Sequence, residues 1–152
     1  MQADENPLRL KKQLCFPIYL CSKEIIRRYA PLLKELDLTY TQYIVMMYFW
    51  EKKQSNVRDL GRALLLDPST LTPLLRRLEA KGYITRVESK LDRRNLDIAI
   101  TDKGARLEEK ALSVPEVMQR CIDLPEDEAK VLYNLVNKAL NNIKRNEIQW
   151  KL

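Results

Sequence analysis

Two short helix patterns, followed at once by two β-rich stretches, occupy the middle of this sequence and constrain the fold more than any other feature. Asn56 or Ser55 can cap a first helix that runs to about Leu64. Val57 and Leu60 lie on the same side of that helix as Leu64. The first helix is therefore expected to be short, with one apolar face turned inward.

A second helix begins four residues later, at Pro68. Asp67 can cap it, and Pro68 suits its first position, where a missing N–H costs nothing. Gly82 marks its end. The buried stripe is expected to comprise Leu71, Leu74, Leu75 and Leu78. The exposed side is expected to present Ser69, Pro73, Arg76 and Arg77, with Thr70 and Thr72 on its flanks. Two helices joined by a tight turn, the second exposing hydroxyls and arginines, are what reading the DNA major groove requires.

Residues 83–87 and 96–100 are β-rich and alternate, with Leu96, Ile98 and Ile100 on one face. Residues 88–95 between them form a polar loop that holds Arg93 and Arg94. An arginine in such a loop is, by itself, more often simply solvated. A hairpin placed directly after a helix-turn-helix, however, predicts a winged helix, whose wing can insert an arginine into the minor groove.

Longer helices are expected on both sides of this middle. An N-terminal helix is indicated by apolar residues at spacings of three and four, which are Leu10, Leu14, Ile18, Cys21 and Ile25, and Pro31 is expected to break it. A mostly buried helix is expected over residues 41–50. A C-terminal amphipathic helix, entered through Pro125, is indicated by Leu132, Leu135, Val136, Ala139, Leu140 and Ile143.

These patterns predict a mainly α fold with a small β-hairpin wing, in which residues 1–152 form a single winged helix-turn-helix domain. Residues 8–35 and 105–150 are expected to supply dimerisation helices, and residues 55–100 the DNA-binding lobe. No stretch approaches the roughly 18 apolar residues that span a bilayer. The first 14 residues have no apolar run with a cleavage site, so the expected location is the cytoplasm.

Composition excludes several kinds of chemistry. The chain has no histidine, which removes histidine-based catalysis and histidine zinc sites, and its three cysteines are too scattered for a thiolate metal cluster. With three glycines it has no glycine-rich phosphate loop. The net charge is +6, and residues 51–100 hold 11 Lys and Arg against 7 Asp and Glu. We therefore expect no metal and no cofactor, and composition leaves an enzyme possible only through cysteine or carboxylate chemistry. The positive charge of residues 51–100 indicates a surface that faces a polyanion.

Four segments in this order resemble the MarR family of regulators: LTPLLRRLE (71–79), GYITR (82–86), DRR (92–94) and TDKG (101–104). The resemblance extends over residues 8–143. It implies a homodimer with interlocked terminal helices and two winged lobes on a pseudo-palindromic duplex. It also implies that Arg94 enters the minor groove, oriented by Asp92. The expected DNA contacts are Ser69, Thr70, Thr72, Pro73, Arg76, Arg77, Arg86, Asp92, Arg93 and Arg94.

The N-terminal helix is similar to that of a narrower branch, the organic-hydroperoxide sensors (OhrR), through LCFPIY (14–19), SKEI (22–25) and YAPLL (29–33). That branch oxidises a cysteine near the start of this helix, here Cys15. Tyrosines matching Tyr29 and Tyr40 hydrogen-bond the cysteine from the partner subunit. The resemblance thus implies a sensor pocket that also includes Phe16 and Tyr19.

The chemistry of the N-terminal segment agrees with a sensing role. A helix start with Lys11 and Lys12 nearby favours the reactive thiolate, and apolar Phe16 and Ile18 suit an organic peroxide better than hydrogen peroxide. Pro17 departs from the branch pattern. Either the helix begins near Cys15, with Pro17 in its first turn, or the helix bends there.

Cys121 follows Cys15 by 106 residues, near the end of a helix expected to begin after Thr101. This separation resembles that of a two-cysteine subgroup of the branch, which implies that Cys121 is a resolving cysteine. Burial as a small apolar residue would explain Cys121 as well. Cys21 shares the apolar stripe and is expected to be structural.

The main hypothesis is a DNA-binding repressor that senses organic hydroperoxide through Cys15 and then releases its operator. A MarR-type repressor released by a small aromatic or lipophilic ligand is the alternative, with the cysteines incidental. A thiol peroxidase is disfavoured, because no arginine or threonine motif surrounds Cys15 and the DNA-reading pattern would have no purpose.

Overall fold

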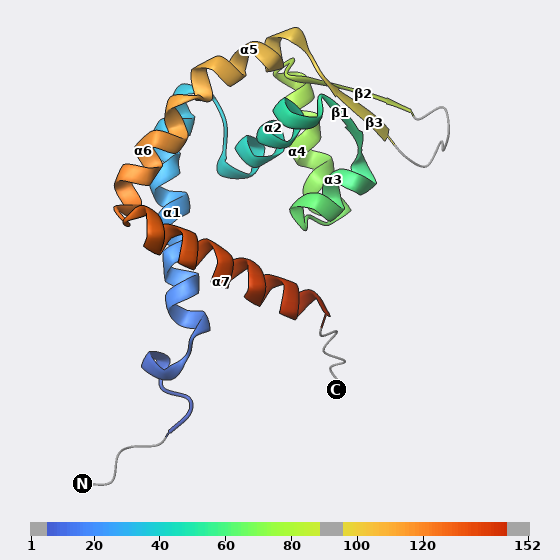
Figure 1. Ribbon diagram of the computed structural model, residues 1–152. Helices are drawn as coiled ribbons and strands as arrows, with labels where there is room; N and C mark the ends of the chain where they lie inside the picture. The colour runs from blue at the N-terminus through green and yellow to red at the C-terminus, as the bar shows by residue number, and fades with distance from the viewer. Residues whose placement is uncertain (1–5, 89–95, 146–152) are drawn as a thin grey trace, which may run out of the picture. The chain divides into compact units, whose positions relative to one another are not determined.

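The computed structural model describes residues 6–88 and 96–145 (Figure 1). Its elements in chain order are η1 (Leu10–Lys12), α1 (Cys15–Glu35), α2 (Tyr40–Lys52), β1 (Gln54–Asn56), α3 (Val57–Leu64), α4 (Pro68–Ala80), β2 (Ile84–Glu88), β3 (Leu96–Ile100), α5 (Asp102–Ala111), α6 (Ser113–Ile122) and α7 (Glu126–Arg145). Contacts divide the chain into two compact units, one up to Pro115 and one from Glu116 onward. The mainly α fold expected from the sequence is confirmed.

The helix-turn-helix forms as expected. The Asn56 side chain caps α3 by accepting the backbone N–H of Asp59 at 2.9 Å. Asp67 caps α4, with Pro68 at the first helical position, and Gly82 follows the helix end with φ +73°. The turn between the two helices is tight, because a Cβ on Gly61 would lie 2.9 Å from the carbonyl oxygen of Leu66.

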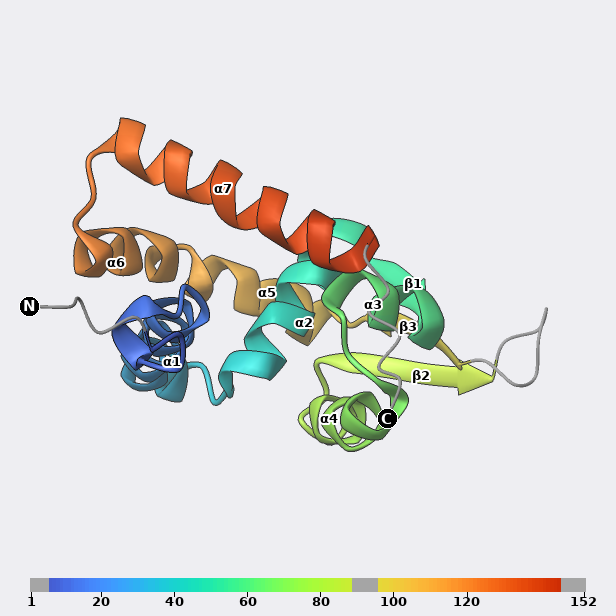
Figure 2. The same ribbon diagram turned by 90° about the horizontal axis from the view of Figure 1, so that it is seen from below.

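The sheet has three antiparallel strands in the order β1-β3-β2 rather than the two expected. β2 and β3 form the hairpin, in which Ile84 pairs with Ile100 and Glu88 with Leu96. β1 adds a short edge by pairing Ser55 with Ile98. β2 lies against α4, as Figure 2 shows, so the hairpin is attached to the second helix of the helix-turn-helix.

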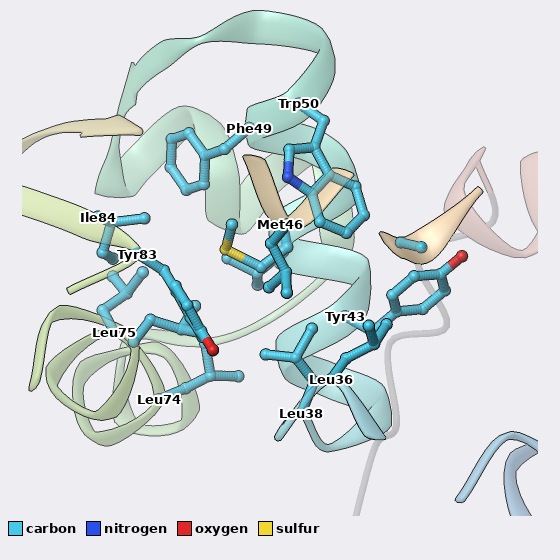
Figure 3. Close-up of a cluster of buried hydrophobic side chains, with 14 of the residues drawn as sticks. Leu36, Leu38, Tyr43, Met46, Phe49, Trp50, Leu74, Leu75, Tyr83 and Ile84 are labelled. Carbon is cyan, nitrogen blue, oxygen red and sulfur yellow. The ribbon is translucent and has the colours of Figure 1, made fainter. Parts of the chain in front are cut away.

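The core of the first unit gathers around α2 (Figure 3). Phe49, Met46 and Val45 of α2 are fully buried, and the α4 leucines Leu71, Leu75 and Leu78 meet them from the helix-turn-helix. Thr39 and Gln42 cap α2 reciprocally, with the Thr39 N–H donating to Gln42 Oε1 at 3.0 Å. The core therefore fixes which side of α4 faces outward.

α1 contains two prolines, Pro17 in its first turn and Pro31 near its other end. The helix begins at Cys15, so Pro17 falls in its first turn, where its missing N–H is harmless. The expected break at Pro31 is wrong, because α1 continues to Glu35. Pro31 is exposed, so water can reach the carbonyl group four residues earlier that loses its helical partner.

The single helix expected to follow Thr101 is also wrong: α5 ends at Ala111 and α6 starts at Ser113. Pro115 gives the reason, because it has no N–H to donate to Ala111 and its ring would clash with that carbonyl group. α7 belongs to the second unit and begins just after Pro125, as expected. The boundaries assigned to the dimerisation helices and the DNA-binding lobe remain predictions.

Candidate nucleic-acid interface and redox site

The outward side of α4 carries the helix residues assigned to DNA from the sequence. All six are exposed, and together we call them the α4 face: Ser69, Thr70, Thr72, Pro73, Arg76 and Arg77. The buried leucines on the opposite side of the helix hold this orientation, because turning α4 would expose them to water. The structure thus gathers three hydroxyl groups and two guanidinium groups on one exposed surface.

Asp67 organises the start of the α4 face. Its Oδ1 accepts the Ser69 hydroxyl and the Thr70 backbone N–H, the latter at 2.9 Å, and its Oδ2 accepts the Thr70 hydroxyl at 3.1 Å. These hydrogen bonds, the one from Ser69 foremost, lower the pKa of Asp67 to about 2. The carboxylate is therefore charged at neutral pH, which suits the positive end of a helix dipole.

Arg86 attaches β2 to α4 through Glu79. Its Nη2 and Nε donate to Glu79 Oε2 at 2.6 and 3.0 Å, and its backbone N–H donates to Oε1 at 3.1 Å. The Arg86 side chain is only 17% exposed, and its hydrogen bonds lower the pKa of Glu79. The guanidinium group thus holds the hairpin on α4. The DNA contact predicted for Arg86 from the sequence stays a prediction.

The tip of the hairpin lies outside the described residues. Asp92, Arg93 and Arg94 all belong to it. The strands on either side pair as far as Glu88 and Leu96, so the hairpin itself is established. The minor-groove role of Arg94 and its orientation by Asp92 remain predictions.

A joint that sequence reasoning missed connects the hairpin, α4 and α5. The Thr101 hydroxyl donates to the Gly82 carbonyl at 2.6 Å, and the Thr101 N–H donates to the Tyr83 carbonyl at 3.0 Å. The Trp50 indole N–H donates to the Gly104 carbonyl at 2.9 Å. A Cβ on Gly104 would lie 2.1 Å from the Tyr83 oxygen, so only glycine fits. In the sequence, residues 101–104 (TDKG) indicated only a resemblance to the MarR family and not these contacts.

Cys15 is the first residue of α1 and is exposed in the single chain. Phe16 beside it is partly buried and Tyr19, one turn on, is exposed, with the Lys23 ammonium nitrogen 5.9 Å from its ring centroid. Of the two arrangements that Pro17 allows, the structure has the helix that begins at Cys15, and the sensing role of Cys15 stays a prediction.

Tyr29 and Tyr40 lie far from this thiol within one chain. Their ring centroids are 5.0 Å apart, and Tyr43 lies 5.8 Å from Tyr29. Burial raises the pKa of Tyr29 and of Tyr43, which keeps these phenols protonated and able to donate. Tyr29 follows Cys15 by 14 residues on α1, a rise of roughly 21 Å. The tyrosines can therefore meet a Cys15 thiol only if it comes from a second chain.

Cys121 is the second-to-last residue of α6 and belongs to the second unit, whereas Cys15 and Cys21 belong to the first. All three are free and exposed in the single chain. The resolving role of Cys121 therefore stays a prediction. Within residues 6–88 and 96–145 no cluster of acidic and cysteine side chains could hold a metal ion, and no helix there is long and apolar enough to cross a membrane.

Comparison with known proteins defines the class of regulator. The family model "Transcriptional regulator SarA/Rot" matches residues 27–111. The HTH-type transcriptional regulator SarZ of Staphylococcus saprophyticus is 44% identical over 139 residues, which cover 89% of this chain and 95% of SarZ. The organic hydroperoxide resistance transcriptional regulator of Bacillus subtilis is 44% identical over 115 residues, which cover 76% of this chain and 78% of that protein.

Solved structures agree. Reduced AbfR bound to DNA, a protein of Staphylococcus epidermidis, has a TM-score of 0.75 and 35% identity over 93% of this chain and 99% of AbfR. A variant of Escherichia coli MarR in complex with operator DNA has a TM-score of 0.76 and 27% identity over 84% of this chain and 93% of MarR. The winged helix of the MarR type is thereby confirmed. The chain belongs to the SarA/Rot family of transcriptional regulators.

Proposed function

We propose that this protein is a DNA-binding repressor whose hold on DNA is controlled by oxidation of Cys15 with organic hydroperoxide. The observation that carries DNA binding is the α4 face, an exposed row of hydroxyls and arginines on the second helix of a helix-turn-helix. Support comes from AbfR and MarR, which were solved on DNA. The DNA contacts we propose are the α4 face together with Asp92, Arg93 and Arg94, while Arg86 positions the hairpin.

The oxidant-sensing part rests on the accessible thiol of Cys15 at the start of α1. The B. subtilis relative is named for organic hydroperoxide resistance. AbfR has been solved on DNA in its reduced and overoxidised forms, and separately with a disulfide formed, so the disulfide is the oxidised state that we connect with release. In our proposal the Cys15 thiolate attacks the peroxide, takes one oxygen to become a sulfenic acid and releases an alcohol. Phe16 and Tyr19 then line the apolar side of the pocket.

The proposal requires a homodimer. Tyr29 and Tyr40 are too distant to contact Cys15 of their own chain, so a partner subunit must bring the two together. Apolar surface for such contact is present on α7, which has seven exposed large hydrophobic residues and no buried residue in the single chain: Val131, Leu132, Tyr133, Leu135, Val136, Leu140 and Ile143. α1 adds exposed Ile18, Leu20 and Ile26.

Cys121 completes the proposed switch. Its thiolate would attack the sulfenic sulfur of the partner's Cys15, forming the disulfide and releasing water. A disulfide needs Cα atoms within about 7 Å, so helices that stand farther apart must move to form it. Such movement would separate the two lobes from successive grooves and release the operator.

The alternative, release by a small aromatic or lipophilic ligand, has one observation in its favour. A groove of about 690 Å³ lies between α3, α4 and the sheet, with an apolar lining that includes Leu65, Leu71 and Leu75. The two mechanisms differ in whether they need Cys15. A ligand would release a protein without Cys15 from its DNA, whereas a peroxide would leave that protein bound.

The test is a gel shift with duplex DNA from upstream of the protein's own gene, with and without cumene hydroperoxide. The unmodified protein should bind and then release. Cys15→Ser should bind and stay bound after peroxide, while the matched control Cys21→Ser should behave as the unmodified protein does. A Cys15→Ser protein that is still released by peroxide contradicts the sensing role, and failure of the unmodified protein to bind any duplex contradicts the DNA-binding role.

A further inference from the structure

Each of the three hydroxyl groups of the α4 face donates its hydrogen bond to another group of the same chain. Ser69 donates to the Asp67 carboxylate, and Thr70 donates to the other oxygen of that carboxylate at 3.1 Å. Thr72 donates to the backbone carbonyl of Pro68 at 2.8 Å. The direction of each bond is fixed by chemistry, because an ionised carboxylate and a carbonyl oxygen can only accept.

The backbone of the same turn offers no donor in place of the hydroxyls. Pro68 has no N–H, and the Ser69 and Thr70 N–H groups both point to the Asp67 carboxylate. The Leu71 N–H donates to the Asp67 carbonyl at 3.0 Å. What the first turn of α4 presents outward is therefore the lone pairs of three hydroxyl oxygens, together with the methyl groups of Thr70 and Thr72. The turn is an acceptor surface.

Donors come one turn later. Ser69, Thr72 and Arg76 lie three and four residues apart, so they follow one another along the same side of the helix. A guanidinium group can only donate. The α4 face thus changes along its length from accepting hydrogen bonds to donating them.

We propose that the first turn of α4 reads which strand of a base pair carries the exocyclic amino group, N6 of adenine or N4 of cytosine, in the major groove. This inference rests on the DNA binding proposed above and deepens it. Amino groups donate to the free lone pairs of Ser69 and Thr72, whereas the major-groove acceptors of guanine and thymine meet only another acceptor. Arg76, one turn on, reads a guanine in the same half-site.

The same geometry limits what these hydroxyls can do with the DNA backbone. Phosphate oxygens only accept, so a hydroxyl would have to leave Asp67 or Pro68 to reach one, and a hydrogen bond to a carboxylate is among the stronger ones to give up. The negative charge of Asp67 also disfavours a phosphate at this end of α4. Ser69, Thr70 and Thr72 therefore specify bases and do not serve as phosphate anchors.

The experiment uses the unmodified protein and a random duplex library. Enriched sequences are first determined, and each adenine or cytosine in them is then replaced by an analogue without its amino group: purine for adenine, 2-pyrimidinone for cytosine. At one or two positions per half-site this should weaken binding about tenfold or more. Adenine and cytosine are distinguished by which analogue has the effect.

The variant Thr72→Val keeps the shape and the methyl group but has no lone pair to offer. It should bind the natural duplex and the analogue duplex nearly equally, and Ser69→Ala should do so at the neighbouring position. The matched control Arg76→Ala should keep the full preference for the amino group while losing preference at a guanine. For each protein we compare its affinity for the natural duplex with its affinity for the analogue duplex. All proteins are measured on the same two duplexes, so the weaker base pairing of the analogues affects every ratio equally.

Enriched sites that tolerate loss of every amino group overturn this inference and leave DNA binding intact. The inference is also overturned if Thr72→Val and Ser69→Ala both distinguish the natural duplex from the analogue duplex as well as the unmodified protein does. A library from which nothing is enriched overturns the proposed function and this inference together. If a variant does not fold, the comparison of natural and analogue duplexes with the unmodified protein still tests the inference.

Discussion

At the scale of single residues, two arginines near the α4 face, Arg76 and Arg86, differ in exposure and in their partners. Arg76 is exposed and lies opposite the leucine stripe, so it touches nothing that the core depends on. Arg86 is largely buried and held by Glu79. Residue type alone made both look like DNA contacts in the sequence. Their exposure distinguishes the two residues. Helical periodicity predicts that Arg76 is exposed. No sequence pattern predicts that Arg86 is mostly buried, because its partner Glu79 lies seven residues away on another element.

We expect Arg76→Ala to weaken binding to the protein's site by about tenfold or more and to relax its base preference, because a guanidinium group that reads a base edge is lost. The free energy of unfolding should change by no more than about 0.5 kcal/mol, as for other exposed substitutions. Fluorescence anisotropy on labelled duplex and urea unfolding measure the two effects. Arg27→Ala on α1 removes the same charge far along the chain from α4 and serves as control. Equal affinity of the Arg76 and Arg27 variants contradicts the placement of the α4 face on DNA.

At the scale of elements, α4 depends on a charged cap. The pKa of Asp67 in the folded chain, about 2, lies below the ordinary value of 3.8. The ionised carboxylate therefore favours folding, and this contribution is complete above about pH 4 and is lost as the pH falls from about 4 toward 2.

Asp67→Asn keeps an oxygen that can accept the Thr70 N–H but removes the charge. The variant should be less stable than the unmodified protein near neutral pH, and the gap between their urea midpoints should narrow at about pH 3. A gap of the same size at both pH values would show that the charge of Asp67 contributes nothing to the cap.

The joint between α5 and the hairpin gives a second prediction at this scale. Gly104→Ala should destabilise the fold by about 2 kcal/mol or more, because the new Cβ would meet the Tyr83 carbonyl at 2.1 Å and that oxygen is held by Thr101. Gly82→Ala is the matched control. It adds the same methyl group at φ +73° with its nearest contact at 3.7 Å, so only backbone strain of about 1 kcal/mol is expected. Thermal unfolding followed by circular dichroism ranks the two, and the reverse order would contradict the close packing at Gly104.

Local signals made some elements predictable and left others hidden. Both helices of the helix-turn-helix could be placed because caps and apolar spacing lie within them, at Asn56, Asp67 and Pro68. β1 could not, since Gln54–Asn56 has no alternation and becomes a strand only by pairing with β3. Pro115 was a visible sign of the break before α6, whereas Pro31 misled because an exposed proline can be tolerated inside a long helix.

The proposed site divides in the same way. The exposed residues of the α4 face could be predicted from the helical period. The position of Cys15 at the start of α1 could be predicted because Pro17 is tolerated in the first turn of a helix. The Glu79–Arg86 pair and the committed hydroxyls of Ser69 and Thr72 depend on three-dimensional contacts or rotamers that no spacing reveals.

At the scale of the whole molecule, the exposed apolar residues of α1 and α7 predict an obligate dimer. A helix with an apolar stripe and no buried residue cannot be stable facing water, so the chain should not persist as a folded monomer. Sedimentation at micromolar concentration should show a dimer, and dilution should lower the thermal midpoint. Leu135→Glu on α7 should disrupt the dimer, with Lys138→Glu, an exposed charge reversal on the same helix, as the control. A folded monomer that is stable at micromolar concentration contradicts the two-lobed arrangement.

Oxidation extends this prediction to the covalent state of the dimer. Cumene hydroperoxide should give a crosslinked dimer on non-reducing gels. Cys15→Ser should abolish the crosslink. Cys121→Ser should still form the sulfenic acid at Cys15 but give no crosslink and proceed to higher oxides. An intersubunit disulfide in the Cys121→Ser protein would contradict the resolving role.

The central claim is that the state of one thiol decides whether the protein holds DNA, and a single titration tests it most directly. Cumene hydroperoxide is added stepwise to the protein on labelled duplex, and each step is divided between anisotropy and mass analysis of the Cys15 peptide. The fraction of DNA released should rise in proportion to the fraction of Cys15 held in the disulfide, and dithiothreitol, by reducing the disulfide, should restore both the thiol and DNA binding. DNA that stays bound when Cys15 is fully converted to the disulfide, or that is released while the thiol is intact, would contradict the sensing role.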